Sequence, residues 1–236
     1  LQMMPDAKCV YSVPYMLSYT GLGYNKQKLP HFQPSWNMLE DESIKGRMTL
    51  LDDQVEVIGA ALFVLGQDAN SVDPAVLEEA RKLVMKWRAN AAKFENEQYK
   101  NGLASGEFHL VMGYSGDVMQ AVEENPTELD FVIPEEGSML SCDVMVIPAL
   151  AGNPELAHQF INFLHDGQNA ADNTEYCYYR CPNQAAYPLL SDEIKNNKSI
   201  FVDEKLLEKS VFTREPDAAG KLLRNEIWSK IKAGAE

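Results

Sequence analysis

"LLDDQVEVIGAALFVLG" (residues 50–66) places three carboxylates where an apolar strand pattern changes into the pattern of an amphipathic helix. Asp53 and Glu56 have the spacing of a capping box, in which each side chain accepts a hydrogen bond from the other residue's backbone N–H. The carboxyl end of a strand is also where open α/β sheets bind ligands. The stretch therefore predicts a strand-to-helix unit with a helix cap or a cation site at the junction, and the local pattern favours the cap.

The rest of the chain alternates between strand and helix patterns, which is typical of an α/β fold with a doubly wound sheet or a pair of such sheets. Residues 106–125 predict a strand, a turn at residues 114–117 and a helix. The other expected strands lie within 8–25, 44–53, 129–137 and 139–149, and the other expected helices within 34–41, 54–66, 71–91, 154–167 and 218–234.

Composition narrows the classes of function. The 236 residues carry a formal net charge of −14 and no basic stripe, which argues against nucleic-acid binding and favours cationic ligands. The longest apolar run, residues 57–66, is too short to span a membrane. Cys177 and Cys181 are spaced for either a disulfide in a turn or two buried thiols, and no zinc spacing links the four cysteines Cys9, Cys142, Cys177 and Cys181.

Catalytic motifs are incomplete. "GYSGD" (113–117) places Ser115 at a strand-to-helix turn, but Asp117 stands where the nucleophile elbow needs its second glycine. His158 and His165 lie seven residues apart on one predicted helix, and two histidines alone rarely form a metal site, so they are expected at the surface or at its boundary. No phosphate-binding or dinucleotide-binding glycine loop is present, and no cofactor is expected.

Several acidic and aromatic residues remain at the ends of strands. Asp143 lies inside the apolar "MLSCDVMVIPA" (139–149), where a buried carboxylate needs either an internal basic partner or an external cation. Carboxylates beside aromatic faces suit an organic ammonium ion. The other candidates for such a site are Asp53, Glu56, Tyr114 and Asp117. For Asp117 the alternative role is that of a cap for the helix that follows.

Five motifs occur together in one order: "YSVPYMLSYTGLGYN", "SWNML…IKGRMTLLDDQVEV", "GEFHLVMGYSGD", "PEEGSMLSCDVMVIPALAGNPELAHQFINFLHD" and "YYRCPNQAAYPLLSDEI". In this order the chain resembles the polyamine-binding proteins, the spermidine/putrescine substrate-binding components of ABC importers. The resemblance implies a periplasmic-binding-protein-like type II two-lobed clamp that closes on its ligand by hinge motion.

The resemblance also implies how the chain is divided between the lobes. Residues 1–21 and 143–189 would form part of the N-terminal lobe, and residues 22–142 and 190–236 the C-terminal lobe. Family members carry a long segment before the "VPY" strand, so the N-terminal lobe is expected to be incomplete here.

The resemblance assigns roles to individual residues. Asp53, Glu56 and Asp143 would pair with amines, and Tyr114 would stack on the ligand chain. Ser141 stands where the family has a tryptophan, and Thr213 stands where the family has an amide. These two departures keep the anionic anchors and weaken the aromatic wall, so amine recognition is better supported than any particular polyamine.

The expected function is therefore that of a non-enzymatic binding protein. It would capture putrescine or spermidine outside the cytoplasmic membrane, in the periplasm or extracellular space, free or lipid-anchored, and deliver it to the permease subunits of an ABC importer. The alternatives are a binding protein for another small organic cation, a sensor that shares the site, and a hydrolase that uses Cys177, Cys181 or Ser115.

Overall fold

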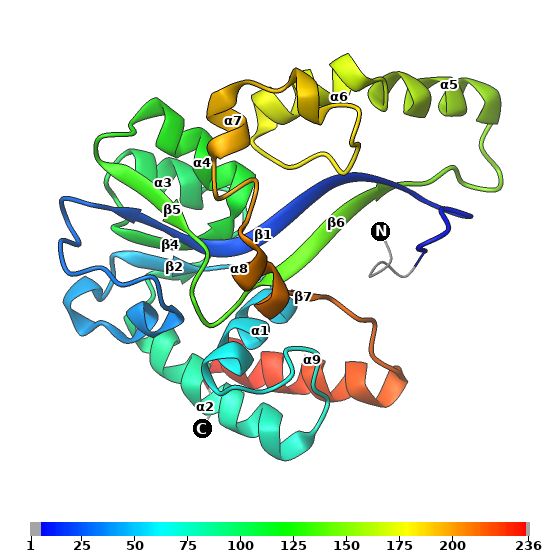
Figure 1. Ribbon diagram of the computed structural model, residues 1–236. Helices are drawn as coiled ribbons and strands as arrows, with labels where there is room; N and C mark the ends of the chain where they lie inside the picture. Colours follow the sequence, from blue (N-terminus) through cyan, green and yellow to red (C-terminus); the bar gives the residue numbers. More distant parts are fainter. Residues whose placement is uncertain (1–5, 235–236) are drawn as a thin grey trace.

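The computed structural model describes residues 6–234 (Figure 1). Its strands are β1 (Val13–Asn25), β2 (Met48–Leu50), β3 (Lys93–Phe94), β4 (Leu110–Tyr114), β5 (Leu129–Val132), β6 (Met139–Met145) and β7 (Val211–Phe212). Its α-helices are α1 (Gln54–Val64), α2 (Pro74–Asn90), α3 (Tyr99–Ala104), α4 (Ser115–Glu124), α5 (Pro154–Leu164), α6 (Gly167–Cys177), α7 (Asp192–Asn196), α8 (Glu204–Lys209) and α9 (Ala218–Ala233). The 3-10 helices are η1 (Trp36–Glu40), η2 (Glu42–Ile44) and η3 (Tyr187–Leu189).

The strands of residues 6–234 form one mixed sheet in the order β3-β2-β4-β1-β6-β7, with β5 also paired to β1. β1 is antiparallel to β4, β5 and β6, whereas β2 is parallel to β3 and β4. The sheet therefore differs from a uniformly parallel doubly wound sheet in the direction of β1. The apolar pattern locates a strand but carries no information about its direction, and β1 runs opposite to its neighbours.

β1 is the strand that connects the two ends of the molecule (Figure 1). Its first half pairs with β6 from Val13 to Tyr19, and its second half pairs with β4 and β5. Gly21 makes this second pairing possible, because a Cβ at Gly21 would lie 2.4 Å from the carbonyl oxygen of Val132 in β5. One continuous strand thus positions residues from both ends relative to each other.

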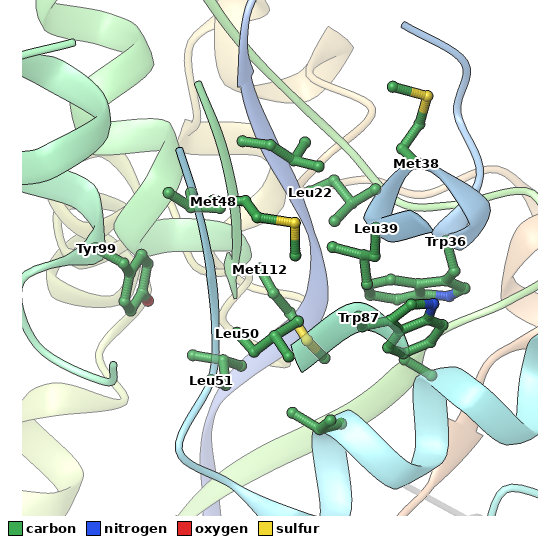
Figure 2. Packing of buried hydrophobic residues seen from close by; sticks show 14 of the residues in the cluster. Leu22, Trp36, Met38, Leu39, Met48, Leu50, Leu51, Trp87, Tyr99 and Met112 are labelled. Carbon is green, nitrogen blue, oxygen red and sulfur yellow. The ribbon is translucent and has the colours of Figure 1, made fainter. Parts of the chain in front are cut away.

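Two hydrophobic clusters flank this strand. The larger one lies around β2, β4, α1 and α2, and Figure 2 shows Leu22, Trp36 and Trp87 among its members. The smaller one consists of Met16 from β1 and residues of the 170–200 region: Ala170, Ala171, Cys181, Ala186, Leu190, Ile194 and Ile200. β1 therefore contributes Leu22 to one cluster and Met16 to the other. The residue boundaries of the two lobes stay a prediction.

α1 begins where the capping pattern places it but is not amphipathic. Every residue from Glu56 to Leu62 is buried, because α1 packs against β6, α2 and α9. Gly59 allows the contact with β6, since a Cβ there would lie 2.8 Å from the sulfur of Met139. A helix that is apolar on all sides is typical of a core position.

The helix predicted at 154–167 is confirmed as α5, and a second helix that the sequence does not predict, α6, follows it. α5 ends at Leu164, and Gly167 starts α6, whose N-cap Asp166 accepts hydrogen bonds from the backbone N–H groups of Gln168 and Asn169. The polar sequence of α6 gives little apolar periodicity, which explains why the pattern missed it. No helix within residues 6–234 is long and apolar enough to cross a membrane.

Candidate functional site

The junction of β2 and α1 holds a buried carboxyl group. Glu56 is 5% exposed, and its Oε2 accepts a hydrogen bond of 2.6 Å from the hydroxyl of Thr20 in β1. Burial raises the pKa of Glu56 to about 7, against the lowering effect of the Thr20 hydrogen bond and with a further increase from the charge of Asp53. A nearby positive charge would favour the ionised form of this carboxyl group.

Asp53 is the N-cap of α1, as the sequence predicts. Its Oδ1 accepts hydrogen bonds from the backbone N–H groups of Val55 at 2.7 Å and Glu56 at 3.2 Å. The other half of the predicted capping box is absent from the described hydrogen bonds, because the Glu56 side chain bonds to Thr20 instead. Glu56 is therefore held by the sheet rather than by its own helix terminus.

Tyr114 ends β4 and lies in an acidic environment. It occupies the N-cap position of α4, which follows the strand directly, so the predicted turn at residues 114–117 is wrong. Burial raises the pKa of the Tyr114 hydroxyl, and nearby carboxylates raise it further. These carboxylates, named here the carboxylate cluster, are Glu56, Asp53, Asp117 and Asp143.

The carboxylate cluster has no cationic partner within the described chain. The ion pairs of residues 6–234 involve other acidic side chains, and no Lys or Arg lies within ion-pair distance of any of the four carboxylates. Like charges that converge without a counterion repel one another. The cluster therefore favours a ligand that brings positive charge.

Asp117 anchors a network of tyrosines. Its Oδ2 accepts a hydrogen bond of 2.8 Å from the Tyr99 hydroxyl, and that hydroxyl accepts one of 3.2 Å from the backbone N–H of Tyr114. The backbone N–H of Asp117 donates to the Tyr179 hydroxyl at 3.3 Å. Asp117 is thus neither a helix cap nor a free carboxylate, and it fixes the backbone that carries Tyr114.

Tyr179 is a site residue that the sequence interpretation did not select. Burial raises the pKa of its hydroxyl, and the charges of Asp117 and Asp143 raise it further. Its ring packs on Gly116, where a Cβ would lie 2.5 Å from the ring. The motif "YYRCPN" contains Tyr179, but no local signal distinguishes it from its neighbour Tyr178.

Asp143 is exposed, which corrects the expectation of a buried carboxylate. It lies on β6 opposite Met16 of β1, next to the exposed Val144. The apolar residues around it in sequence do not surround it in space, because this end of β6 is open to solvent. Its charge still contributes to the raised pKa of Tyr15, after burial, Cys177 and Cys181, as well as those of Tyr114 and Tyr179.

Ser141 and Thr213 line the same cavity of about 280 Å³ between β6 and the segment after β7. The cavity is also lined by Asp6 and Ser12 near the start of the described chain. Ser141 lies two residues before Asp143 on β6, so both side chains are on one face of the strand. Thr213 also borders a second cavity of about 160 Å³ beside Gln54.

Burial argues against catalysis by the residues that the sequence offers for it. Ser115 is 2% exposed, and its Oγ accepts a hydrogen bond from the backbone N–H of Tyr19. Burial raises the pKa of Cys142 to about 11 and also raises the pKa of Cys177 and Cys181, the opposite of an activated thiolate. All four cysteines are free thiols, so the disulfide alternative for Cys177 and Cys181 is wrong.

Metal binding also lacks support. His158 is exposed on α5, as expected, and His165 is partly exposed at the end of that helix. No group of three or more potential metal ligands gathers within residues 6–234. The arrangement that remains is anionic and aromatic, which suits the ends and methylene groups of an organic ammonium ion.

Comparison with known proteins gives a consistent result. Residues 2–202 match the family profile described as bacterial extracellular solute-binding protein. The chain is 34% identical to the putrescine/cadaverine-binding protein of Pseudomonas aeruginosa, with 94% of this chain and 66% of that protein aligned. It is also 34% identical to the spermidine/putrescine-binding periplasmic protein of Escherichia coli, with 95% of this chain and 64% of that protein aligned.

A solved structure supports the same relationship. The spermidine/putrescine ABC transporter substrate-binding protein PotD from Streptococcus pneumoniae superimposes with a TM-score of 0.85 at 29% identity, over 96% of this chain and 70% of that structure. The chain thus spans somewhat less than two thirds of the length of the curated relatives, and its fold is that of the two-lobed solute-binding proteins.

Proposed function

The chain belongs to the bacterial extracellular solute-binding protein family, and on that premise we propose that it binds a linear polyamine such as putrescine or spermidine for import by an ABC transporter. The names of its relatives support a polyamine as the class of ligand. In this proposal the chain itself performs no reaction, and permease subunits in the membrane receive the ligand.

The observation that carries the proposal is the carboxylate cluster around Tyr114. Four carboxylates influence one tyrosine, and none of them has a Lys or Arg partner within residues 6–234. A diammonium or triammonium ligand would neutralise this cluster and place its methylene groups against Tyr114 and Tyr179. Anionic solutes are disfavoured, because they would add to the existing repulsion.

The positions of the site residues fit a clamp. Asp53, Glu56 and Tyr114 belong to elements of the larger hydrophobic cluster, whereas Tyr179 follows α6, next to the smaller cluster. Asp143 lies on β6, which pairs with the part of β1 that leads to the smaller cluster. A ligand held between these groups would contact both sides and favour a closed arrangement.

The cellular location of the protein and a second candidate ligand follow from its family membership. The family is extracellular, and the Escherichia coli relative is named as periplasmic. We propose the same side of the cytoplasmic membrane for this protein, with or without a lipid anchor. Another small organic cation is the second candidate ligand. The hydroxyl groups of Ser141 and Thr213 line part of the cavity, and they offer no apolar surface that would favour a methylene chain.

Calorimetric titration with putrescine, cadaverine and spermidine tests the proposal. The titration uses this chain and a longer form that includes the additional length of its relatives. Binding of at least one polyamine by a folded sample is the expected result. Absence of heat with every polyamine, in folded samples of both lengths, would remove the polyamine assignment and leave the fold unchanged.

The variant Asp143→Asn identifies one of the anchors. Loss of a charge-assisted hydrogen bond to an ammonium group should weaken polyamine binding by about 10- to 100-fold. Glu124→Gln is the matched control, because Glu124 is an exposed carboxylate at the end of α4. Equal affinities of the Asp143→Asn and Glu124→Gln variants would exclude Asp143 from the site.

A further inference from the structure

Two serine hydroxyls face each other between β1 and β6. Ser18 and Ser141 are directly opposed in the antiparallel register, and their Oγ atoms are 2.6 Å apart. Both residues are partly exposed, so the hydroxyl pair is accessible from one side of the sheet. One hydroxyl donates to the other, which leaves lone pairs on both oxygens for an additional N–H donor.

The pair lies between the two ends of the proposed site. Ser18 and Thr20 are two residues apart in β1 and therefore share a face, and Thr20 carries the hydrogen bond to Glu56. Ser141 and Asp143 share a face of β6 for the same reason. Along this face the order is therefore Glu56 with Thr20, then the hydroxyl pair, then Asp143.

This order matches the chemistry of a triamine better than that of a diamine. Terminal ammonium groups would meet the carboxylates at the two ends, and the middle of the ligand would pass over Ser18 and Ser141. A methylene group there would displace water from two hydroxyls without replacing its hydrogen bonds, whereas a secondary ammonium would donate to them.

We propose that Ser18 and Ser141 form a specificity site for an internal secondary ammonium, so that the protein prefers triamines to diamines of equal length. The inference rests on the proposed polyamine function. It concerns which polyamine is selected, and it assigns this selection to two hydroxyl groups rather than to an aromatic wall.

A pair of matched ligands tests the proposal. Spermidine is compared with the diaminooctane that carries both amines at its ends, in which a CH2 group replaces the internal NH. Calorimetric dissociation constants for both ligands give a preference ratio for the wild type and for the Ser18→Ala and Ser141→Ala variants. Spermidine carries one more charge, but the carboxylate cluster is intact in all three proteins, so only the part of the ratio lost in the variants belongs to the hydroxyls.

We expect wild-type binding to favour spermidine by about tenfold or more, and each alanine variant to lower the ratio several-fold. Ser141→Thr keeps a hydroxyl and should retain most of the preference, while Ser229→Ala, which removes an exposed hydroxyl on α9, should leave the ratio unchanged. A ratio that is the same in wild type and both alanine variants overturns the inference and leaves the polyamine function standing. Binding of putrescine without binding of spermidine also overturns the inference, whereas absence of binding of every polyamine in folded samples of both lengths overturns the proposed function instead.

Discussion

Glu56 should make ligand affinity depend on pH near neutrality. Its pKa of about 7 in the free protein means that a cationic ligand must displace a proton below this pH. Because the ionised fraction of such a group falls about tenfold from pH 8 to pH 6, the affinity for putrescine should fall by about the same factor. Calorimetry at the two pH values measures this change. The Glu56→Gln variant should bind putrescine weakly, and its affinity should lack this pH dependence. An equal pH dependence in both proteins would assign the titration to another group.

The same residue should limit the stability of the ligand-free protein at high pH. The folded state keeps the Glu56 proton up to about pH 7, whereas an unfolded glutamate loses it near its ordinary pKa of 4.5. The folded state therefore binds more protons between these values, so stability falls as the pH rises through this range. Glu56→Gln should be more stable than wild type at pH 8 by about 1–3 kcal/mol and should show no gain at pH 4. Urea denaturation at both pH values checks this, with Glu124→Gln as the unaffected control.

At the residue scale the sequence predicts what is local. The cap at Asp53 follows from its own segment, and the structure confirms it. The partner of Glu56 is Thr20, 36 residues earlier, so no local pattern contains it. The predicted burial of Asp143 is wrong for a related reason, because its apolar sequence neighbours lie on a strand whose end is exposed. Burial depends on which other elements pack against a strand, and the sequence of the strand itself does not specify these elements.

At the scale of elements, the junction of β4 and α4 depends on the hydroxyl of Tyr99. This hydroxyl accepts from the backbone of Tyr114 and donates to Asp117, and Tyr99 is fully buried. Tyr99→Phe leaves both partners without their bond and should lower the free energy of unfolding by about 1–3 kcal/mol, with weaker polyamine binding because Tyr114 loses its support. Urea denaturation and calorimetry measure the two effects. Tyr176→Phe, at an exposed tyrosine of α6, is the control, and equal stabilities would show that water replaces the Tyr99 hydroxyl.

Elements with strong end signals were predictable, and elements without apolar periodicity were not. α2 begins at Pro74 after the N-cap Asp73, within the range 71–91 that the sequence predicts, because an N-cap aspartate followed by proline is a strong start signal. α6 has only its cap Asp166 as a signal, because its sequence is mostly polar and its buried residues Ala170 and Ala171 pack in the smaller cluster with Met16. The direction of β1 was equally hidden, since strand residues alternate in the same way in parallel and antiparallel sheets.

At the scale of the whole molecule, the resemblance to a family supplied what patterns could not. Periodicity predicts an α/β protein, whereas the two-lobed solute-binding fold was expected only from motifs in a shared order, and the structural comparison confirms it. The reason is physical: β1 contributes residues to both hydrophobic clusters, so the two clusters are not built from separate stretches of sequence with a linker between them. Composition shifts, which mark ordinary domain boundaries, are therefore absent where the chain crosses.

The described chain should expose a continuous apolar surface on α5. Leu156, Phe160 and Phe163 are 58%, 60% and 59% exposed, and their spacing places them along one side of the helix. Apolar patches of this kind bind hydrophobic dyes and promote self-association. Replacing Phe160 and Phe163 together by serine should reduce both dye fluorescence and the self-association measured by sedimentation, without loss of helix content. Leu222→Ser, at an exposed leucine on α9, is the control for a single apolar side chain. If the double variant and the Leu222→Ser variant bind the dye equally, the α5 side chains are covered in solution, and self-association must involve another part of the surface.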